Sequence, residues 1–373
     1  MSVRSKKIDI VVINDLVTDN RVHKVAQSLM EMGFTPKLTG RRKRKSMPLT
    51  PRDYATHRMR LFFERGPMFY FEFNIRLFFR LLFSSSKIIL SNDLDTLAAS
   101  YFAAKLSRKK LVYDSHEYFT EVPELINRPF KQKMWRALEK LILPRLKNAF
   151  TVSQSIADEY QKLYGTPFKV IRNLPVRNKA LEYQQDLTIV PHEEKIVIYQ
   201  GALNLGRGLE FAIQSMRFLQ GVQLWLVGSG DLEEYLKILA RQLGLQFKVK
   251  FFGQVPFQEL SQLTAQADLG LSIEEDLGLN YRYALPNKLF DYIQHRIPVL
   301  VSSLPEMTRI VQKYGIGQVL QTHQPEGMAK QIEEILHNKT LHQEYQNKLL
   351  IASKDLCWES EKPVLENIFN NLR

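Results

Sequence analysis

Short apolar runs alternate with amphipathic stretches along most of the chain. In the first half, apolar and β-branched runs predict strands near 8–14, 87–91, 110–114 and 149–152, with helices between them such as 20–33 and 94–105. In the second half, the same alternation predicts strands near 195–200, 222–227, 248–252, 269–273 and 297–301, and helices near 209–219, 232–243, 256–265 and 287–294. Alternating strands and helices form parallel sheets covered on both faces, so we expect an α/β protein with two doubly wound, Rossmann-like domains.

A polar stretch with little periodicity separates the two series and predicts a linker at 176–194. We therefore expect an N-terminal domain at 1–175 and a C-terminal domain at 195–354, followed by a helix at about 355–373 that crosses back to the first domain. Two such domains would face a cleft. Ligands of open parallel sheets bind beyond the carboxyl ends of the strands, so the candidate site residues follow the strands.

Composition is that of a globular protein: of 373 residues, 45% are hydrophobic and 24% are charged, which argues against general disorder. The single cysteine, Cys357, excludes an intramolecular disulfide and argues against a cysteine-based metal site. The polar residues 1–7 lead directly into a strand, so no signal peptide is expected. No apolar run approaches the roughly 18 residues of a transmembrane helix, and the expected location is the cytoplasm.

Positive charge is concentrated in one segment. The formal net charge is +13, and residues 41–80 contain eleven Lys/Arg but three Asp/Glu. Such a segment is either a solvated loop or suited to an anionic partner: nucleic acid, acidic lipid headgroups or a phosphorylated substrate. Nucleic acid is the weakest of these, because no stacking platform or groove-reading motif accompanies the charge.

The aromatic stretch 69–83 predicts a helix with a narrow polar stripe at Glu72, Arg76 and Arg80. At about 1.5 Å per residue it is too short to span a bilayer. We expect it to pack on a sheet as a crossover helix. The alternative is that residues 41–83 lie against an anionic membrane surface. Both interpretations hold if one face of the helix packs on the sheet and the other docks on the membrane.

The first predicted domain has polar groups after three strands. Thr18 or Asp19 is suited to cap the first helix, and Arg21 either reaches an anion or is a surface charge. The pair Asp93 and Asp95 has the spacing of a weak metal motif, but helix capping explains it better, so we predict no metal site. A further strand ends at Asp114 and is followed by His116 and Glu117, where a site is expected.

The second predicted domain has a glycine-rich loop and a helix start suited to phosphate. Gly201, Gly206 and Gly208 permit a tight loop, and Arg207 adds a fixed charge. In the block 283–299, a helix begins after Pro286. Its first amides, near Lys288 and Leu289, are suited to bind phosphate, and Asp291 lies about one turn further on. Phosphate-binding groups with a carboxylate one turn later describe a nucleoside-diphosphate site.

In order and spacing these residues resemble the GT-B glycosyltransferases, particularly the retaining enzymes of family 4. The resemblance spans nearly the whole chain and is carried by Asp19-x-Arg-Val, Val112–Glu117, Leu226–Gly230, Val249–Val255 and Pro286–Pro298. The chain departs from the family at three places. Ala202 replaces a basic residue, Tyr283 stands where the first of two paired glutamates would fall, and Asp291 replaces the second.

The resemblance implies site residues. The residue pattern and the resemblance together assign the nucleotide and diphosphate to Gly201, Arg207, Gly208, Gly253, Gln254, Val255, Asn287, Lys288, Leu289 and Asp291. His116 would contact the donor sugar, and it acts with Arg207 and Lys288 as the catalytic set. Arg21, Glu117 and Tyr283 are expected on the acceptor or sugar side.

The expected activity is transfer of a sugar, with retained configuration, from a nucleoside diphosphate sugar to a sugar or lipid-linked acceptor. If residues 41–83 touch the inner face of the cytoplasmic membrane, an acceptor of envelope polysaccharide or glycolipid synthesis is expected. No metal or other cofactor is expected, because Arg207, Lys288 and the helix amides would stabilise the leaving diphosphate. Two alternatives stay open. One is a nucleotide-sugar epimerase of the same fold, and the weaker one is a basic nucleic-acid-binding protein.

Overall fold

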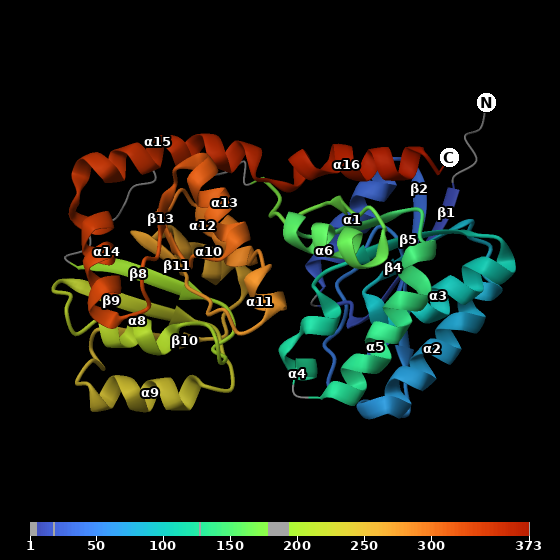
Figure 1. Cartoon of the computed structure of the whole chain (residues 1–373), viewed down its shortest axis with the longest axis horizontal. Helices are drawn as coiled ribbons and strands as arrows, with labels where there is room; N and C mark the ends of the chain where they lie inside the picture. The colour runs from blue at the N-terminus through green and yellow to red at the C-terminus, as the bar shows by residue number, and fades with distance from the viewer. Residues whose placement is uncertain (1–5, 18, 127, 178–193, 373) are drawn as a thin grey trace. The chain divides into compact units, whose positions relative to one another are not determined.

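The computed structural model describes residues 6–17, 19–126, 128–177 and 194–372, which divide into two compact units (Figure 1). Unit 1 contains residues 1–172 and 362–373, and unit 2 contains residues 173–361. The chain returns to unit 1 within the last helix, α16 (Trp358–Asn370). Most of the predicted linker, 178–193, lies outside the described residues.

Unit 1 is built on a parallel seven-stranded sheet with the order β3-β2-β1-β4-β5-β6-β7. Its strands are β1 (Lys6–Asp15), β2 (Phe34–Arg42), β3 (Ala55–Arg60), β4 (Ile88–Asn92), β5 (Lys110–Ser115), β6 (Ala149–Thr151) and β7 (Lys169–Val170). Its helices before α16 are α1 (Asn20–Glu31), α2 (Gly66–Leu82), α3 (Leu94–Ser107), α4 (Pro123–Ile126), α5 (Pro129–Ile142) and α6 (Gln154–Tyr164).

Unit 2 is built on a parallel six-stranded sheet with the order β10-β9-β8-β11-β12-β13. Its strands are β8 (Lys195–Gln200), β9 (Val222–Val227), β10 (Val249–Gly253), β11 (Leu269–Ser272), β12 (Val299–Val301) and β13 (Gly317–Val319). Its helices before α16 are α8 (Leu209–Ser215), α9 (Glu233–Gln242), α10 (Phe257–Ala265), α11 (Leu279–Arg282), α12 (Asn287–Gln294), α13 (Pro305–Tyr314), α14 (Pro325–His337) and α15 (Lys339–Asp355).

The two sheets share one topological feature that positions candidate sites. In each sheet the strand order reverses beside the first strand of the unit, between β1 and β4 in unit 1 and between β8 and β11 in unit 2. Loops that leave neighbouring strands at such a point diverge and leave room for a ligand. The prediction of two doubly wound parallel-sheet domains is therefore confirmed.

Two strands of unit 1 correct the interpretation of the basic segment as a solvated loop. Arg41 and Arg42 end β2, and β3 contains Arg58, whose guanidinium lies 2.7 Å from a carboxylate oxygen of Asp15. Neither strand has the continuous apolar run of the central strands: the edge strand β3 has one buried residue, Met59, and β2 includes a proline, a glycine and three basic residues. Hydrophobic periodicity therefore could not predict them.

Helix α2 packs on the unit 1 core, as expected for a crossover helix. Phe69, Phe73, Leu77 and Leu81 are buried in a cluster with residues of β1, β3, β4 and α3. Figure 1 shows α2, α3 and α5 side by side over one face of the sheet.

The polar stripe of α2 holds the preceding loop. The Glu72 carboxylate accepts hydrogen bonds from the amides of Phe62 and Phe63, and the Arg76 guanidinium donates to the carbonyl of Arg60. The stripe therefore fixes the connection between β3 and α2.

The end of α16 packs within unit 1. The ring of Phe369 meets the ring of Phe34 edge-on, with 5.8 Å between the ring centres, and the ammonium of Lys110 donates to the carbonyl of Leu372. Among the described helices, none combines the length and the apolar character that crossing a bilayer requires.

Two glycines with the same backbone geometry allow a matched stability test. Gly208 and Gly244 both have φ of +69°, which disfavours any side chain. At Gly208 a Cβ would lie 2.3 Å from the carbonyl oxygen of Ile273, whereas at Gly244 no atom lies within 4 Å. Both alanine variants therefore gain strain of about 1 kcal/mol, but Gly208→Ala alone also displaces a backbone. We expect it to lower the free energy of unfolding, measured in urea, by at least about 2 kcal/mol more than Gly244→Ala; equal losses would contradict this geometry.

Candidate functional site

In unit 2, side chains from three segments converge on the buried carboxylate of Glu274. Glu274 follows β11, and one of its oxygens lies 2.7 Å from the Lys288 ammonium in the first turn of α12. Arg207, just before α8, places a guanidinium nitrogen 3.6 Å from the same oxygen. The Lys288 ammonium also lies 3.9 Å from the centre of the Tyr199 ring in β8. The loops on both sides of the unit 2 switch point thus share one charged cluster.

The cluster carries one excess positive charge. Burial alone would raise the pKa of Glu274, but Lys288 and Arg207 outweigh burial and lower that pKa, so the carboxylate is ionised at neutral pH. Glu274 is fully buried and Lys288 is 8% exposed, whereas Arg207 is 29% exposed. The Arg207 Nε is buried and has no hydrogen-bond partner among the described residues. A partly open guanidinium with an unused donor is suited to an added anion.

The glycine-rich loop lies directly against this cluster. At Gly201, where φ is +137°, a Cβ would lie 3.5 Å from the Lys288 side chain. The amide of Glu275 donates to the carbonyl of Gly206 at 2.9 Å, which ties the loop after β8 to the segment after β11. The loop is therefore held close to both cations.

Asp291 is held by a hydrogen-bonded chain. Its carboxylate accepts from the amide nitrogen of Gln200 at 2.9 Å, and the amide oxygen of Gln200 accepts from the hydroxyl of Thr264 at 2.8 Å. Gln200 is the last residue of β8, so strand, helix α10 and helix α12 are linked at one point. The arrangement orients a half-buried carboxylate one turn from Lys288.

The start of α12 differs from the prediction in one respect. The amide of Leu289 is not available to phosphate, because it donates to the carbonyl of Pro286 at 3.2 Å, in a tightened first turn. The side-chain oxygen of Asn287 accepts from the amide of Asn173 at 3.0 Å. The phosphate-binding role predicted for this helix start therefore falls mainly on Lys288.

The remaining predicted residues of unit 2 lie farther along the sheet or just after a short helix. Gly253 ends β10, with φ of +66°, and its carbonyl accepts from the amide of Gly228; Gln254 and Val255 follow it. Strand β9 separates β10 from β8. Tyr283 directly follows α11. The structure thus brings Arg207, Lys288 and Gly201 together, while these four residues occupy neighbouring loops.

In unit 1, the ring of His116 is held by two carboxylates. Its Nδ1 lies 3.2 Å from Asp93, and its Nε2 lies 3.1 Å from Asp114 and 3.1 Å from the side-chain oxygen of Asn92. Burial alone would lower the pKa of His116, but Asp93 and Asp114 outweigh burial and raise that pKa well above its usual value. The ring is therefore an imidazolium at neutral pH, with both N–H groups donated.

Two predictions for unit 1 are wrong. Arg21 is neither a surface charge nor free to reach an anion, because its side chain is 4% exposed and its guanidinium pairs with Asp114 at 2.8 Å. Asp93 does not cap α3 with its side chain, which instead accepts from the amide of His116 at 2.9 Å. Its φ of +61° and ψ of +162° are strained for any residue but glycine.

The other predictions for unit 1 concern Asp19, Thr18, Glu117 and a metal site. Asp19 does cap α1, accepting from the amide of Val22, whereas Thr18 lies outside the described residues. Glu117 follows the cluster, and its carbonyl accepts from the Ser115 hydroxyl. Within the described ranges, no group of three His, Cys, Asp or Glu is arranged to hold a metal ion.

Glu274 was missed in the sequence, although a usable signal exists. Glu274 and Glu275 follow the buried strand β11 after one further residue, Ile273, and a polar group after a buried strand is the pattern that singled out His116. Asn92, whose side-chain oxygen contacts His116, is likewise the last residue of the buried strand β4.

Comparison with known proteins places both units in one enzyme class. The family described as Glycosyltransferase Family 4 matches residues 19–174, and Glycosyl transferases group 1 matches residues 184–349. Sucrose-phosphate synthase from Thermosynechococcus elongatus has a TM-score of 0.79 at 16% identity, covering 99% of each chain. The chain belongs to the GT-B glycosyltransferases.

Two further comparisons extend this result. Anabaena HepE, solved in complex with UDP, has a TM-score of 0.74 to this GT-B glycosyltransferase at 14% identity and covers 98% of this chain and 100% of its own. The uncharacterized glycosyltransferase MJ1607 of Methanocaldococcus jannaschii is 25% identical over 222 residues, 55% of this chain and 54% of that protein. The chain thus aligns with about half the length of this curated relative. At such identities the solved structures establish the fold alone.

The positive charge of the His116 ring can be tested by titration. Because its folded pKa is raised, its pairing stabilises the fold below about pH 6.5, and this stability is lost as pH rises through the folded pKa. In an NMR titration of the histidine rings, we expect His116 to titrate well above its usual value and Asp93→Asn to lower the pKa of His116, since it removes one of the two carboxylates that raise it. His295 is the internal control, since burial lowers its pKa. A His116 that titrates below His295 would contradict this arrangement.

The buried cluster of this GT-B glycosyltransferase can be tested through stability. Glu274→Gln leaves the Lys288 ammonium buried without its carboxylate, and we expect a loss of about 3 kcal/mol in the free energy of unfolding. The control is Asp276→Asn, which breaks an exposed pair with Arg282 and should cost less than about 1 kcal/mol. Urea unfolding of both variants measures the difference. Equal effects would show that Glu274 does not neutralise a buried cation.

Proposed function

We propose that this protein transfers a sugar from a nucleoside diphosphate sugar to an acceptor hydroxyl, with retention of the anomeric configuration. The observation that carries the proposal is the pair of cations, Arg207 and Lys288, held by one buried carboxylate at the switch point of unit 2. A diphosphate is the ligand that such a site suits best. The solved Anabaena HepE structures with UDP and with UDP-glucose support this class of donor.

The difficult step is departure of the diphosphate from the anomeric carbon. The bond between that carbon and the phosphate oxygen breaks, the acceptor oxygen bonds to the same carbon, and the acceptor's proton passes to the leaving diphosphate. Arg207 and Lys288 stabilise the charge that grows on the leaving group, and Asp291 is oriented to accept hydrogen bonds from the ribose hydroxyls. The proposed reaction includes no metal or other cofactor, because these two side chains supply the positive charge.

Glu274 has a supporting part in this proposal. By pairing with both cations, it holds them within reach of one anion while the site is empty. It also lowers the cost of burying the Lys288 ammonium. Preorganised charges need no rearrangement when the leaving group forms, which is the source of their catalytic effect.

In unit 1, the state of His116 limits its part in the reaction. An imidazolium with both N–H groups donated to carboxylates and Asn92 is not a proton acceptor. We therefore assign His116 to electrostatic support of the sugar and not to general base catalysis. The acceptor is proposed to be a sugar or a lipid-linked sugar of envelope polysaccharide or glycolipid synthesis.

A ligand screen tests the donor class first. We expect one of UDP, GDP and ADP, or one of their sugars, to raise the melting temperature, because a ligand that binds only the folded state stabilises it. Incubation with the donor alone then separates transferase from epimerase. A new nucleotide sugar without acceptor would replace the transferase proposal by epimerisation, and no shift with any nucleotide would refute both.

The clamp itself is tested by charge removal. We expect Arg207→Ala to lower turnover by about a hundredfold or more with an unchanged fold, since it removes one stabilising group of the transition state. Because Lys288→Ala would leave Glu274 buried and unpaired, the second variant is Lys288→Met with Glu274→Gln, which removes both charges together. Arg217→Ala, an exposed cation after α8, is the control. Full turnover in the first two variants would refute the clamp.

A further inference from the structure

Helix α2 carries two apolar stripes, and among the residues that the structure describes one stripe is buried and the other is exposed. The inner stripe, Phe69, Phe73, Leu77 and Leu81, lies in the unit 1 core. The outer stripe has exposed fractions of 50% at Met68, 61% at Phe71, 43% at Ile75, 51% at Phe79 and 80% at Phe83, just after the helix. Spacings of three and four residues place these five side chains along one face, over about 22 Å. Single exposed apolar residues are ordinary, but a continuous stripe of this size marks a contact surface.

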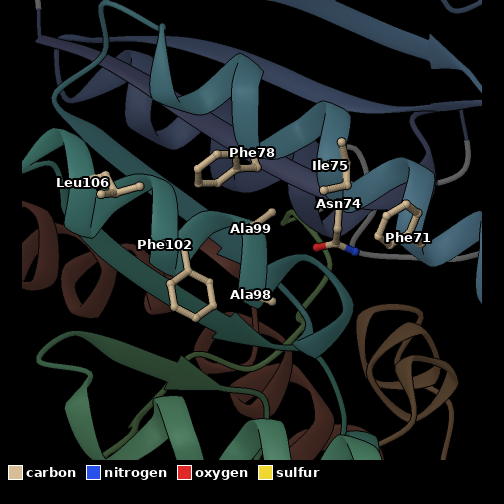
Figure 2. A pocket seen from close by; sticks show the side chains of 8 residues that line it. All are labelled: Phe71, Asn74, Ile75, Phe78, Ala98, Ala99, Phe102 and Leu106. Atoms are coloured by element: carbon tan, nitrogen blue, oxygen red, sulfur yellow. The ribbon is translucent and has the colours of Figure 1, made fainter.

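An apolar groove runs beside the outer stripe, between α2 and α3. It encloses about 450 Å³ and is lined by Phe71, Asn74, Ile75 and Phe78 of α2 and by Ala98, Ala99, Phe102 and Leu106 of α3 (Figure 2). Its one polar lining residue, Asn74, donates its amide to the carbonyls of Tyr70 and Asp95. Phe102 and Leu106 are themselves 43% and 67% exposed, so the apolar surface continues from α2 onto α3.

Positive charge surrounds this apolar surface. Residues 60–110 contain nine Lys/Arg and four Asp/Glu. Two of the acidic side chains do not present their charge to the surface, because Glu72 accepts from the amides of Phe62 and Phe63 and Asp95 is buried. Exposed cations remain at the edges, with Arg65 before α2 and Lys105 and Arg108 at the end of α3.

We propose that the outer stripe of α2, with the α2–α3 groove, docks on an anionic lipid bilayer. The exposed phenylalanines enter the boundary between headgroups and acyl chains, the groove accepts a hydrocarbon chain, and the surrounding cations contact acidic headgroups. Charge decides between a bilayer and a second copy of the chain. A symmetric dimer through this face would bring two positively charged surfaces together, whereas an anionic bilayer is complementary to it.

The proposal predicts lipid binding that depends on both the stripe and the charge. We expect the protein to float with vesicles of phosphatidylglycerol and phosphatidylcholine, and to bind them about tenfold or more tightly than vesicles of phosphatidylcholine alone. Phe71→Ser with Phe79→Ser should weaken this binding about tenfold or more. Lys105→Gln with Arg108→Gln should weaken it chiefly at low salt. No nucleotide sugar is needed, so the result is independent of the proposed transferase activity.

Controls distinguish docking from loss of folding or from self-association. Phe247→Ser with Phe257→Ser removes two phenylalanines of unit 2 that are 82% and 76% exposed, and should leave vesicle binding unchanged. The melting temperatures of both double variants should match that of the unchanged protein, since every replaced ring is exposed. Three results would each overturn the proposal: no binding to either vesicle, equal loss in both phenylalanine double variants, or a dimer in analytical ultracentrifugation that only the α2 double variant dissociates.

Discussion

The buried carboxylate of Glu274 is the constraint on which the functional interpretation depends. The two cations Lys288 and Arg207 lie against the same carboxylate oxygen, which offsets their mutual repulsion. Without this carboxylate, the Lys288 ammonium would be nearly buried and unpaired. Such a charge is unfavourable, so the side chain would not keep its present place at the start of α12. The same contact joins the loop after β8 to the segment after β11, so the electrostatic pair and the topological switch point of unit 2 belong to one arrangement.

Unit 1 contains a comparable buried cluster in which the charges are inverted. There a single cationic ring, His116, lies between two carboxylates, and the second of these is neutralised on its other side by Arg21. The strained backbone of Asp93 accompanies this arrangement. Its carboxylate accepts from the amide of His116 and does not cap the helix that follows. Both units thus hold a fixed charge at the carboxyl ends of their strands, where parallel sheets bind ligands.

Much of the fold could be predicted from periodicity because the central strands are continuous apolar runs. The strands 195–200 and 222–227 and the helix 287–294 were predicted with the bounds that the structure shows. The edge strand β3 and its neighbour β2 were missed, because partial exposure permits arginine and lysine where a central strand requires apolar residues. Site residues after apolar strands were found by position. Their partners were not: that Arg21 meets Asp114, or that the Leu289 amide closes onto Pro286, depends on tertiary distances that no local pattern encodes.

The outer stripe of α2 shows how one helix can satisfy the core and still face outward. A lipid surface at this helix would accord with a lipid-linked acceptor, whereas the chemistry of transfer depends on how unit 2 holds the diphosphate. The most direct measurement is a crystal structure of the protein with UDP or with the nucleotide that stabilises it most. We expect the terminal phosphate within hydrogen-bond distance of both the Arg207 guanidinium and the Lys288 ammonium, with the ribose beside Asp291. A nucleotide bound elsewhere, with the Lys288–Glu274 pair untouched and Arg207 facing solvent, would contradict it.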